Sequence, residues 1–126
     1  MSFSDFLETE ILDHVFGGNA YSAPATLYLA LFTAAPDDTG GGTEVSGTNY
    51  VRKAIAFTVS GDTASNSAAV EFDTAGSDWG TITHVGIYDA STAGNLLDWA
   101  ALSASKAIAT GDVFRIPSGD YDITLD

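Results

Sequence analysis

The sequence is poor in two kinds of residue, cysteine and the basic amino acids. It contains no cysteine, which excludes disulfide bonds and zinc sites built on cysteine ligands. Four basic residues stand against seventeen acidic ones, so the formal net charge is −13 over 126 residues. Because four scattered bases cannot neutralise a phosphate backbone, we expect no nucleic-acid partner.

Long hydrophobic runs are absent as well. The longest apolar stretch, 27–32, is far shorter than a membrane span, and the first residues lack both the basic segment and the apolar stretch of a signal peptide. We therefore expect a protein that is made and used without export or membrane insertion and that has no membrane partner.

Motifs of known chemistry are missing too. The sequence has neither a nucleophile elbow nor a phosphate-binding loop, and the two histidines, His14 and His84, fall on different expected elements. The acidic residues do not follow the twelve-residue calcium-loop pattern. The sequence thus predicts no enzyme, no cofactor and no metal site. Two less favoured alternatives stay open: a cation held by acids from several loops, and sugar binding by Trp79 or Trp99.

What the chain does contain is enough apolar material for a core. Hydrophobic residues make up 45% of the sequence, so it can bury an interior and must carry its charge outside. The length fits a single domain, which we place over residues 1–126.

One helix is expected, over residues 4–16. Ser4 is a suitable N-cap, acidic residues follow in the first turn, and Gly17-Gly18 supplies a stop. The apolar residues of this segment recur at three- and four-residue steps and form one stripe, which we expect to cover the sheet: Phe3, Phe6, Leu7, Ile11 and Val15, flanked by Leu12 and Phe16.

The rest of the chain has the pattern of short strands joined by turns. The segment 25–33 is apolar on both faces, which is typical of a central strand covered on both sides. Strands at this spacing, with turn residues between them, predict a mainly β fold: an antiparallel β-sandwich, or a barrel-like variant, with one N-terminal helix. The expected strands are 25–33, 50–59, 68–72, 81–89, 96–102, 105–109, 113–116 and 121–125.

Residues 34–49 form the one long stretch without a strand or helix pattern. The segment contains Pro36 and three consecutive glycines from Gly40. Loops of this length in a compact domain are often functional, although many are simply mobile. Our hypothesis is that this loop becomes ordered on docking.

Several short segments of the chain have a distinctive order when they are taken together. They are Phe16-Gly17-Gly18, Pro24 to Pro36, Gly42 to Gly47, Trp79 to Asp89, Gly94 to Leu97 and the Gly111-Asp112 turn. In these segments the chain resembles a widespread family of small virion proteins of tailed bacteriophages, whose members are called tail, fibre or head-decorating proteins. The likeness covers nearly the whole chain and implies a non-enzymatic structural part of the particle, without catalytic residues.

This resemblance and the charge suggest a location in the virion, assembled in the host cytoplasm. An acidic surface suits the outside of a DNA-filled head. The first expectation is therefore a capsid cement or decoration protein, a homo-oligomer and most simply a trimer, docked on other virion proteins such as the major capsid protein. The alternative is a tail, baseplate or fibre component, and a carbohydrate-binding module ranks third.

The candidate protein interface combines the helix stripe with the 34–49 loop and its flank. Its candidate residues are Phe6, Leu7, Ile11, Asp37, Asp38, Glu44 and Tyr50.

Overall fold

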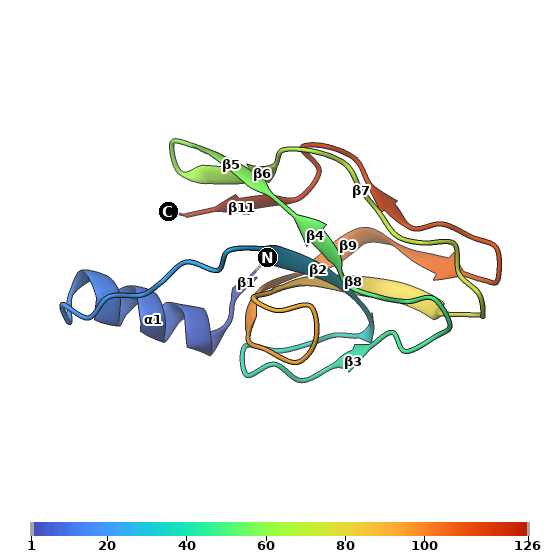
Figure 1. The fold of residues 1–126 in the computed structure, drawn as a ribbon, viewed down its shortest axis with the longest axis horizontal. Coiled ribbons are helices and arrows are strands. Elements are labelled where there is room, and N and C mark those ends of the chain that lie inside the picture. Colours follow the sequence, from blue (N-terminus) through green and yellow to red (C-terminus); the bar gives the residue numbers. More distant parts are fainter. Residues whose placement is uncertain (1, 126) are drawn as a thin grey trace.

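The computed structural model describes residues 2–125, which form one helix and eleven β-strands (Figure 1). This confirms the mainly β class with a single N-terminal helix. The elements are β1 (Ser2–Phe3), α1 (Asp5–Val15), β2 (Leu27–Ala34), β3 (Thr43–Glu44), β4 (Lys53–Ile55), β5 (Phe57–Ser60), β6 (Thr63–Asn66), β7 (Val70–Glu71), β8 (Gly80–Tyr88), β9 (Leu96–Ile108), β10 (Arg115–Ile116) and β11 (Asp122–Thr124).

The strands make three antiparallel sheets. The largest has the order β1-β9-β8-β2-β3, and β4 also pairs with β2. A two-stranded sheet joins β10 to β7, and a three-stranded sheet has the order β11-β6-β5. All pairings in these sheets are antiparallel, which confirms the antiparallel pairing that the sequence predicts.

The helix begins and ends where its sequence predicts. The Ser4 side chain accepts a hydrogen bond from the Leu7 amide, and the chain leaves the helix at Phe16, followed by Gly18 with φ of 76°. A positive φ is unfavourable for residues with a Cβ, so glycine suits this exit. With 11 residues, α1 is too short to cross a membrane, and it is the one helix among residues 2–125.

Strand β2 is the central strand that its two apolar faces predict. It lies between β8 on one side and β3 with β4 on the other, and residues 29–32 are all at most 1% exposed. The helix packs on this sheet, as its apolar stripe predicts, but mainly at β9 rather than at β2. The strand's Leu29 and Leu31 belong to a cluster completed by β7, β10 and their neighbouring loops, and Phe6 and Leu7 of the helix pack against that cluster.

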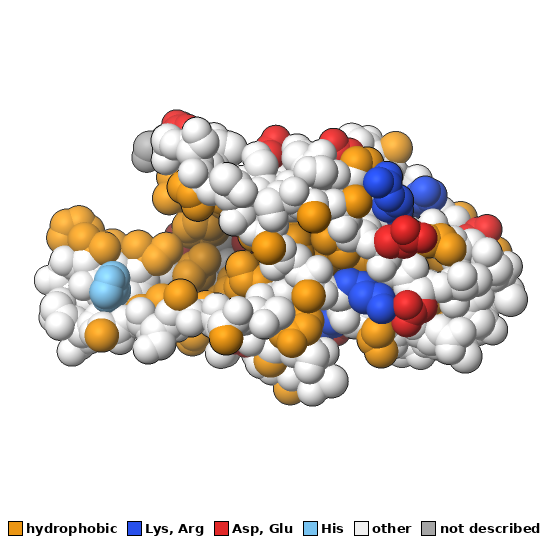
Figure 2. All heavy atoms as spheres, turned by 45° about the horizontal axis from the view of Figure 1, so that its top comes forward, with side chains coloured by type: hydrophobic (Ala, Val, Ile, Leu, Met, Phe, Trp, Pro, Cys, Tyr) orange, Lys and Arg blue, Asp and Glu red, His pale blue; other side chains and the backbone are white. Residues whose placement is uncertain are grey.

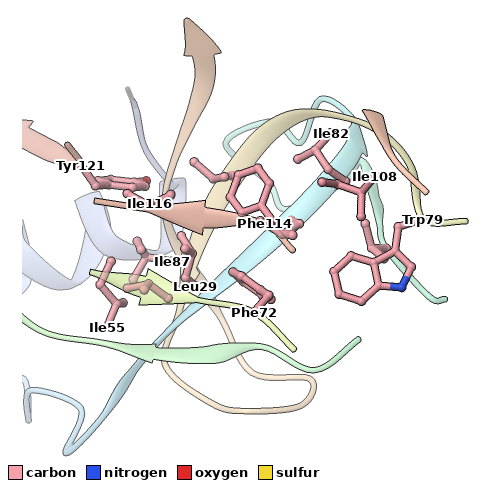
Figure 3. Close-up of a cluster of buried hydrophobic side chains, with 14 of the residues drawn as sticks. Leu29, Ile55, Phe72, Trp79, Ile82, Ile87, Ile108, Phe114, Ile116 and Tyr121 are labelled. Carbon is pink, nitrogen blue, oxygen red and sulfur yellow. The ribbon is translucent and has the colours of Figure 1, made fainter. Parts of the chain in front are cut away.

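The hydrophobic core lies between the large sheet and the two smaller ones (Figure 3). Phe72 and Phe114 meet edge to face, with ring centroids 5.9 Å apart. Tyr121 and Phe57 make a similar contact at 5.8 Å at the other end of the cluster. Each pair packs within one small sheet and its flanks, since Phe72 follows β7 and Phe114 precedes β10, whereas Phe57 begins β5 and Tyr121 precedes β11.

The segment 50–59, expected as one strand, is two strands in different sheets. Its first part is β4, which pairs with β2, and its second part is β5, which pairs with β6. The chain changes sheet at Ala56. As a result Ile55 is buried, whereas Val59, four residues later in the chain, is 72% exposed.

Two further differences from the expected strands concern β9 and β6. The segments 96–102 and 105–109 are one strand, β9, which pairs with β8 through a register shift. Strand β6 was not predicted, because Thr63-Ala64-Ser65-Asn66 has little hydrophobic alternation. It forms through its hairpin with β5, around the turn at Gly61, and through pairing with β11.

The 34–49 loop is more regular than its composition suggests. It contains β3, which pairs with the end of β2, and the Val45 amide donates to the carbonyl of Leu31 at 3.0 Å. Gly40, Gly41 and Gly42 all have positive φ, which explains the run of glycines. The loop is therefore held against the sheet within the single chain.

Candidate docking surface

The helix projects from one end of the molecule as an arm. Figure 1 shows α1 lying beside the return segment 17–26, at the same end of the molecule as the β5–β6 hairpin and the C-terminus. None of its residues is fully buried. Helices of this length are marginal on their own in water, so α1 depends on the little packing that it has.

An apolar hollow separates the arm from the small three-stranded sheet (Figure 2). Its volume is about 320 Å³, and the surface that it presents is almost wholly apolar. We call it the α1–β11 groove. Its lining residues are Phe3, Leu7, Leu27, Phe57, Val59, Gly61, Asp62, Thr63, Ala64, Ile87, Leu97, Asp98, Ile123 and Leu125.

The exposed apolar residues of the chain gather around this groove. Three of them, Leu12, Val15 and Phe16, form what we call the helix tip and are 59%, 60% and 82% exposed. Val59 and Leu125, on the opposite wall, are 72% and 53% exposed. Figure 2 shows hydrophobic side chains inside the hollow and along the arm. A continuous apolar surface of this kind is typical of a protein-interaction site.

A buried carboxylate lies at the base of the groove. Asp98 is 1% exposed, and its Oδ2 accepts a hydrogen bond of 2.7 Å from the Tyr121 hydroxyl. Among residues 2–125 no group hydrogen-bonds its Oδ1. Burial raises the pKa of Asp98 to about 6, and the Tyr121 bond limits that rise.

The three candidate residues on the helix have different surroundings. Leu7 lines the groove, which agrees with a place in an interface. Phe6 packs edge to face on Tyr21, with ring centroids 6.5 Å apart, and so serves to hold the return segment. Ile11 is half-buried between Leu7 and the exposed helix tip.

The two loop aspartates stabilise the loop itself. The exposed Asp37 accepts two hydrogen bonds from Thr39, from its hydroxyl and its amide, and these lower the pKa of Asp37. Asp38 accepts hydrogen bonds from Ser2 Oγ at 2.8 Å and from Trp99 Nε1 at 2.9 Å. Asp38 thus fastens the loop to β1 and β9.

Glu44 and Tyr50 belong to a partly buried polar network rather than to a free surface. Glu44 receives two hydrogen bonds from Arg52, at 2.8 and 2.9 Å, and a third from the Tyr50 hydroxyl at 2.6 Å. The Tyr50 ring stacks on Phe72 and meets Trp79 edge to face. Burial, together with the bond to Glu44, raises the pKa of Tyr50.

One group of acids lies close enough together to suggest a metal site. Carboxylate oxygens of Asp5, Glu8 and Asp38 are within 4.8 Å of one another at the start of α1. Acids in a first helical turn are already favoured by the helix dipole, and Asp38 has its own hydrogen bonds. The cluster therefore does not by itself indicate an ion.

The two tryptophans do not form open sugar platforms. Trp79 is 4% exposed, lies in the core and donates from Nε1 to the Thr48 carbonyl at 3.0 Å. Trp99 is half-buried and donates to Asp38. Neither tryptophan therefore offers an open face for stacking on a sugar, which removes the residues on which the carbohydrate-binding alternative depends.

Sequence reasoning found one wall of the groove and missed the other. The available signal is the apolar alternation within the expected strands 50–59 and 121–125, which puts Phe57 with Val59 on one face and Ile123 with Leu125 on one face. Nothing in the sequence indicated that these two segments, more than sixty positions apart, share one small sheet facing the helix.

Comparison with models of known protein families identifies the family of this chain. A family model described as "Podophage GP4 fiber I protein gp80" matches residues 2–124, which is nearly the whole chain. No curated protein matches the sequence.

Proposed function

The chain belongs to the podophage GP4 fiber I protein gp80 family, and on that premise we propose that it is a tail or fibre component of a phage particle that works as a homo-oligomer. Membership makes it a non-enzymatic structural protein and a part of the virion, as the resemblance implied. The function is therefore assembly, and the relevant chemistry is that of docking surfaces.

The single observation that carries the proposal is the extent of the family match. It covers residues 2–124, so it includes the helical arm, all three sheets and both walls of the groove. The family description names a fibre, which supports the tail, baseplate or fibre alternative over the capsid cement protein that the sequence analysis placed first.

The shape of the chain agrees with an assembly role. An apolar arm and an apolar groove at one end of an acidic molecule provide an adhesive region, and the charge elsewhere opposes unspecific aggregation. We infer a symmetric homo-oligomer, in the simplest case a trimer, that attaches to other virion proteins at the tail.

Antibody labelling of intact particles tests the location. Gold-labelled antibody against this chain should mark each particle at the tail in small copy number. Dense labelling over the head would contradict the proposal and restore the cement interpretation. Native mass spectrometry of the purified chain tests the oligomer separately, with a trimer as the expected species.

A further inference from the structure

The helix tip and the α1–β11 groove have the properties of two halves of one contact. We propose that the helix tip of one copy of this chain docks into the α1–β11 groove of a neighbouring copy. This inference rests on the homo-oligomer proposed above and names the surfaces that form it. The contact is head to tail, because the tip and the groove are different surfaces of the same chain.

The distribution of exposed apolar residues is the first argument. Of the six large hydrophobic residues that are exposed among residues 2–125, five lie on the tip or on the opposite groove wall, and Val51 is the exception. Phe16, at 82% exposure, is the most exposed of them and stands at the end of the arm. A projecting aromatic residue and an apolar hollow on one chain make its surface complementary to itself.

The apolar area is the second argument. Side chains of this size present on the order of 150–200 Å² when free, so the five exposed residues leave roughly 500 Å² of apolar surface uncovered. In one tip-in-groove contact these five residues are divided between the two copies, and a stable protein pair buries about 1,600 Å² over both partners. The half-buried groove residues, among them Leu7, Phe57 and Ile123, add to the apolar area on the groove side.

The third argument concerns which partner fits. The groove is lined by apolar groups from α1, β5, β6 and β11, with Asp62 and the buried Asp98 on its lining and no base among its residues. A copy of the same chain brings the acids of its own helix, Glu8, Glu10 and Asp13, toward this region. Salt screens the repulsion between the exposed acids of the two copies, but it does not weaken the burial of apolar surface. The apolar contact therefore decides whether the two copies associate.

The effect of salt on binding distinguishes a second copy of this chain from the main alternative occupant of the groove, a basic apolar segment of another virion protein. Contact between two acidic copies becomes tighter as salt screens their repulsion. Docking of a basic segment becomes weaker under the same change. The sign of the salt dependence therefore identifies the occupant.

A pair of matched substitutions tests the tip. We compare the full chain with Phe16→Ser and with Val51→Ser by sedimentation equilibrium. Both change an exposed hydrophobic residue to serine, but Val51 lies outside the groove. Phe16→Ser should weaken association at least about tenfold, as for an aromatic anchor, and Val51→Ser should leave it unchanged. Equal association of all three proteins overturns the proposal.

Complementation tests the pairing of tip with groove. Val59→Asp puts a charge on the groove wall, and Phe16→Ser removes the tip. Each variant alone should associate at least about tenfold more weakly than the wild type, yet a mixture should form pairs, because one copy retains a tip and the other a groove. Circular dichroism spectra matching the wild type establish that both variants fold. A mixture that stays monomeric while the wild type associates overturns the head-to-tail contact.

Single cysteines provide a direct readout, since the chain has none of its own. Mixing Phe16→Cys with Leu125→Cys protein under oxidation should give a cross-linked pair, and replacing Phe16→Cys by Val51→Cys should give none. Raising the ionic strength from about 0.1 to about 1 M, which shortens the Debye length from about 10 to about 3 Å, should keep or tighten association.

Two results tell the failure of this inference from the failure of the proposed function. Tail labelling together with a wild-type oligomer that Phe16→Ser leaves intact, or that salt weakens tenfold, overturns the tip-in-groove contact alone. Absence of the chain from the tail overturns the proposed function, whatever the solution oligomer.

Discussion

The Tyr121 hydroxyl donates a 2.7 Å hydrogen bond to Oδ2 of Asp98, while Oδ1 of the same carboxylate receives no bond from residues 2–125. Asp98 lies in β9 of the large sheet and Tyr121 immediately precedes β11 of the three-stranded sheet, and both are at least 95% buried. A buried carboxylate with only one partner favours its protonated form, and this gives the fold a dependence on pH.

The pH dependence is the first prediction. The pKa of Asp98 is about 6 in the folded chain, whereas its ordinary value is 3.8, so folding favours the protonated carboxyl group. The stability that this group contributes is complete below about pH 4 and is lost as pH rises through about 6, a change of about 3 kcal/mol. Asp98→Asn should remove this fall, measured by urea unfolding at several pH values.

The control for that experiment is Asp120→Asn, which changes an exposed carboxylate. Its unfolding profile between about pH 4 and 6 should follow the wild type. If Asp98→Asn also followed the wild type, the buried carboxylate would not be the group that titrates.

The Arg52 network gives a second prediction. The Arg52 side chain is 8% exposed, bonds both oxygens of Glu44, donates to the Ala90 and Ala93 carbonyls, and lies 3.6 Å from the centre of the Tyr88 ring. Arg52→Met should lower the free energy of unfolding by about 3 kcal/mol, because the partly buried Glu44 loses its partner.

Lys53 offers the matched comparison for Arg52. Its pair with Asp73 is more exposed, at 28% and 59% for the two side chains. Lys53→Met should therefore cost about 0–1 kcal/mol. Equal losses for Arg52→Met and Lys53→Met in chemical denaturation would contradict the importance assigned to the Arg52 network.

A third prediction concerns packing at Gly86 on β8. This residue is buried, and a Cβ placed there would lie 2.9 Å from both Leu96 Cδ1 and Phe32 Cε2. Gly86→Ala should destabilise the chain by about 1–3 kcal/mol through overpacking. Thermal unfolding measures the loss, and Thr81→Ala, at an exposed position of the same strand, should change stability by less than about 0.5 kcal/mol.

The helix cap provides a fourth prediction. Ser4 Oγ accepts a 3.2 Å hydrogen bond from the Leu7 amide, and the residue is 2% exposed. Ser4→Ala should cost about 1 kcal/mol and speed amide hydrogen exchange in the first turn of α1. Thr9→Ala, in the exposed middle of the helix, should leave that first turn protected. Unchanged exchange in Ser4→Ala would show that the cap is not what holds the arm.

Some features of this protein follow from the sequence because their causes are local. The helix over 4–16 is specified by its cap, its acidic first turn and its glycine stop, all within one segment. The central position of β2 follows from its two apolar faces. The family resemblance is likewise carried by short segments of the chain.

Other features were decided only by the tertiary structure, because they depend on which distant segments pair. The division of 50–59 between two sheets comes from different partners, β2 for Ile55 and β6 for Phe57. The β6 strand exists through its neighbours, not through its own composition.

The groove and the Asp98–Tyr121 pair have the same origin. A strand pattern fixes which residues share a face, but it does not say what that face meets. The sequence therefore predicts a β-rich, acidic protein with one helix that has an apolar stripe. Long-range packing alone placed that helix opposite β5 and β11, and so left between them an apolar space that the single chain does not fill.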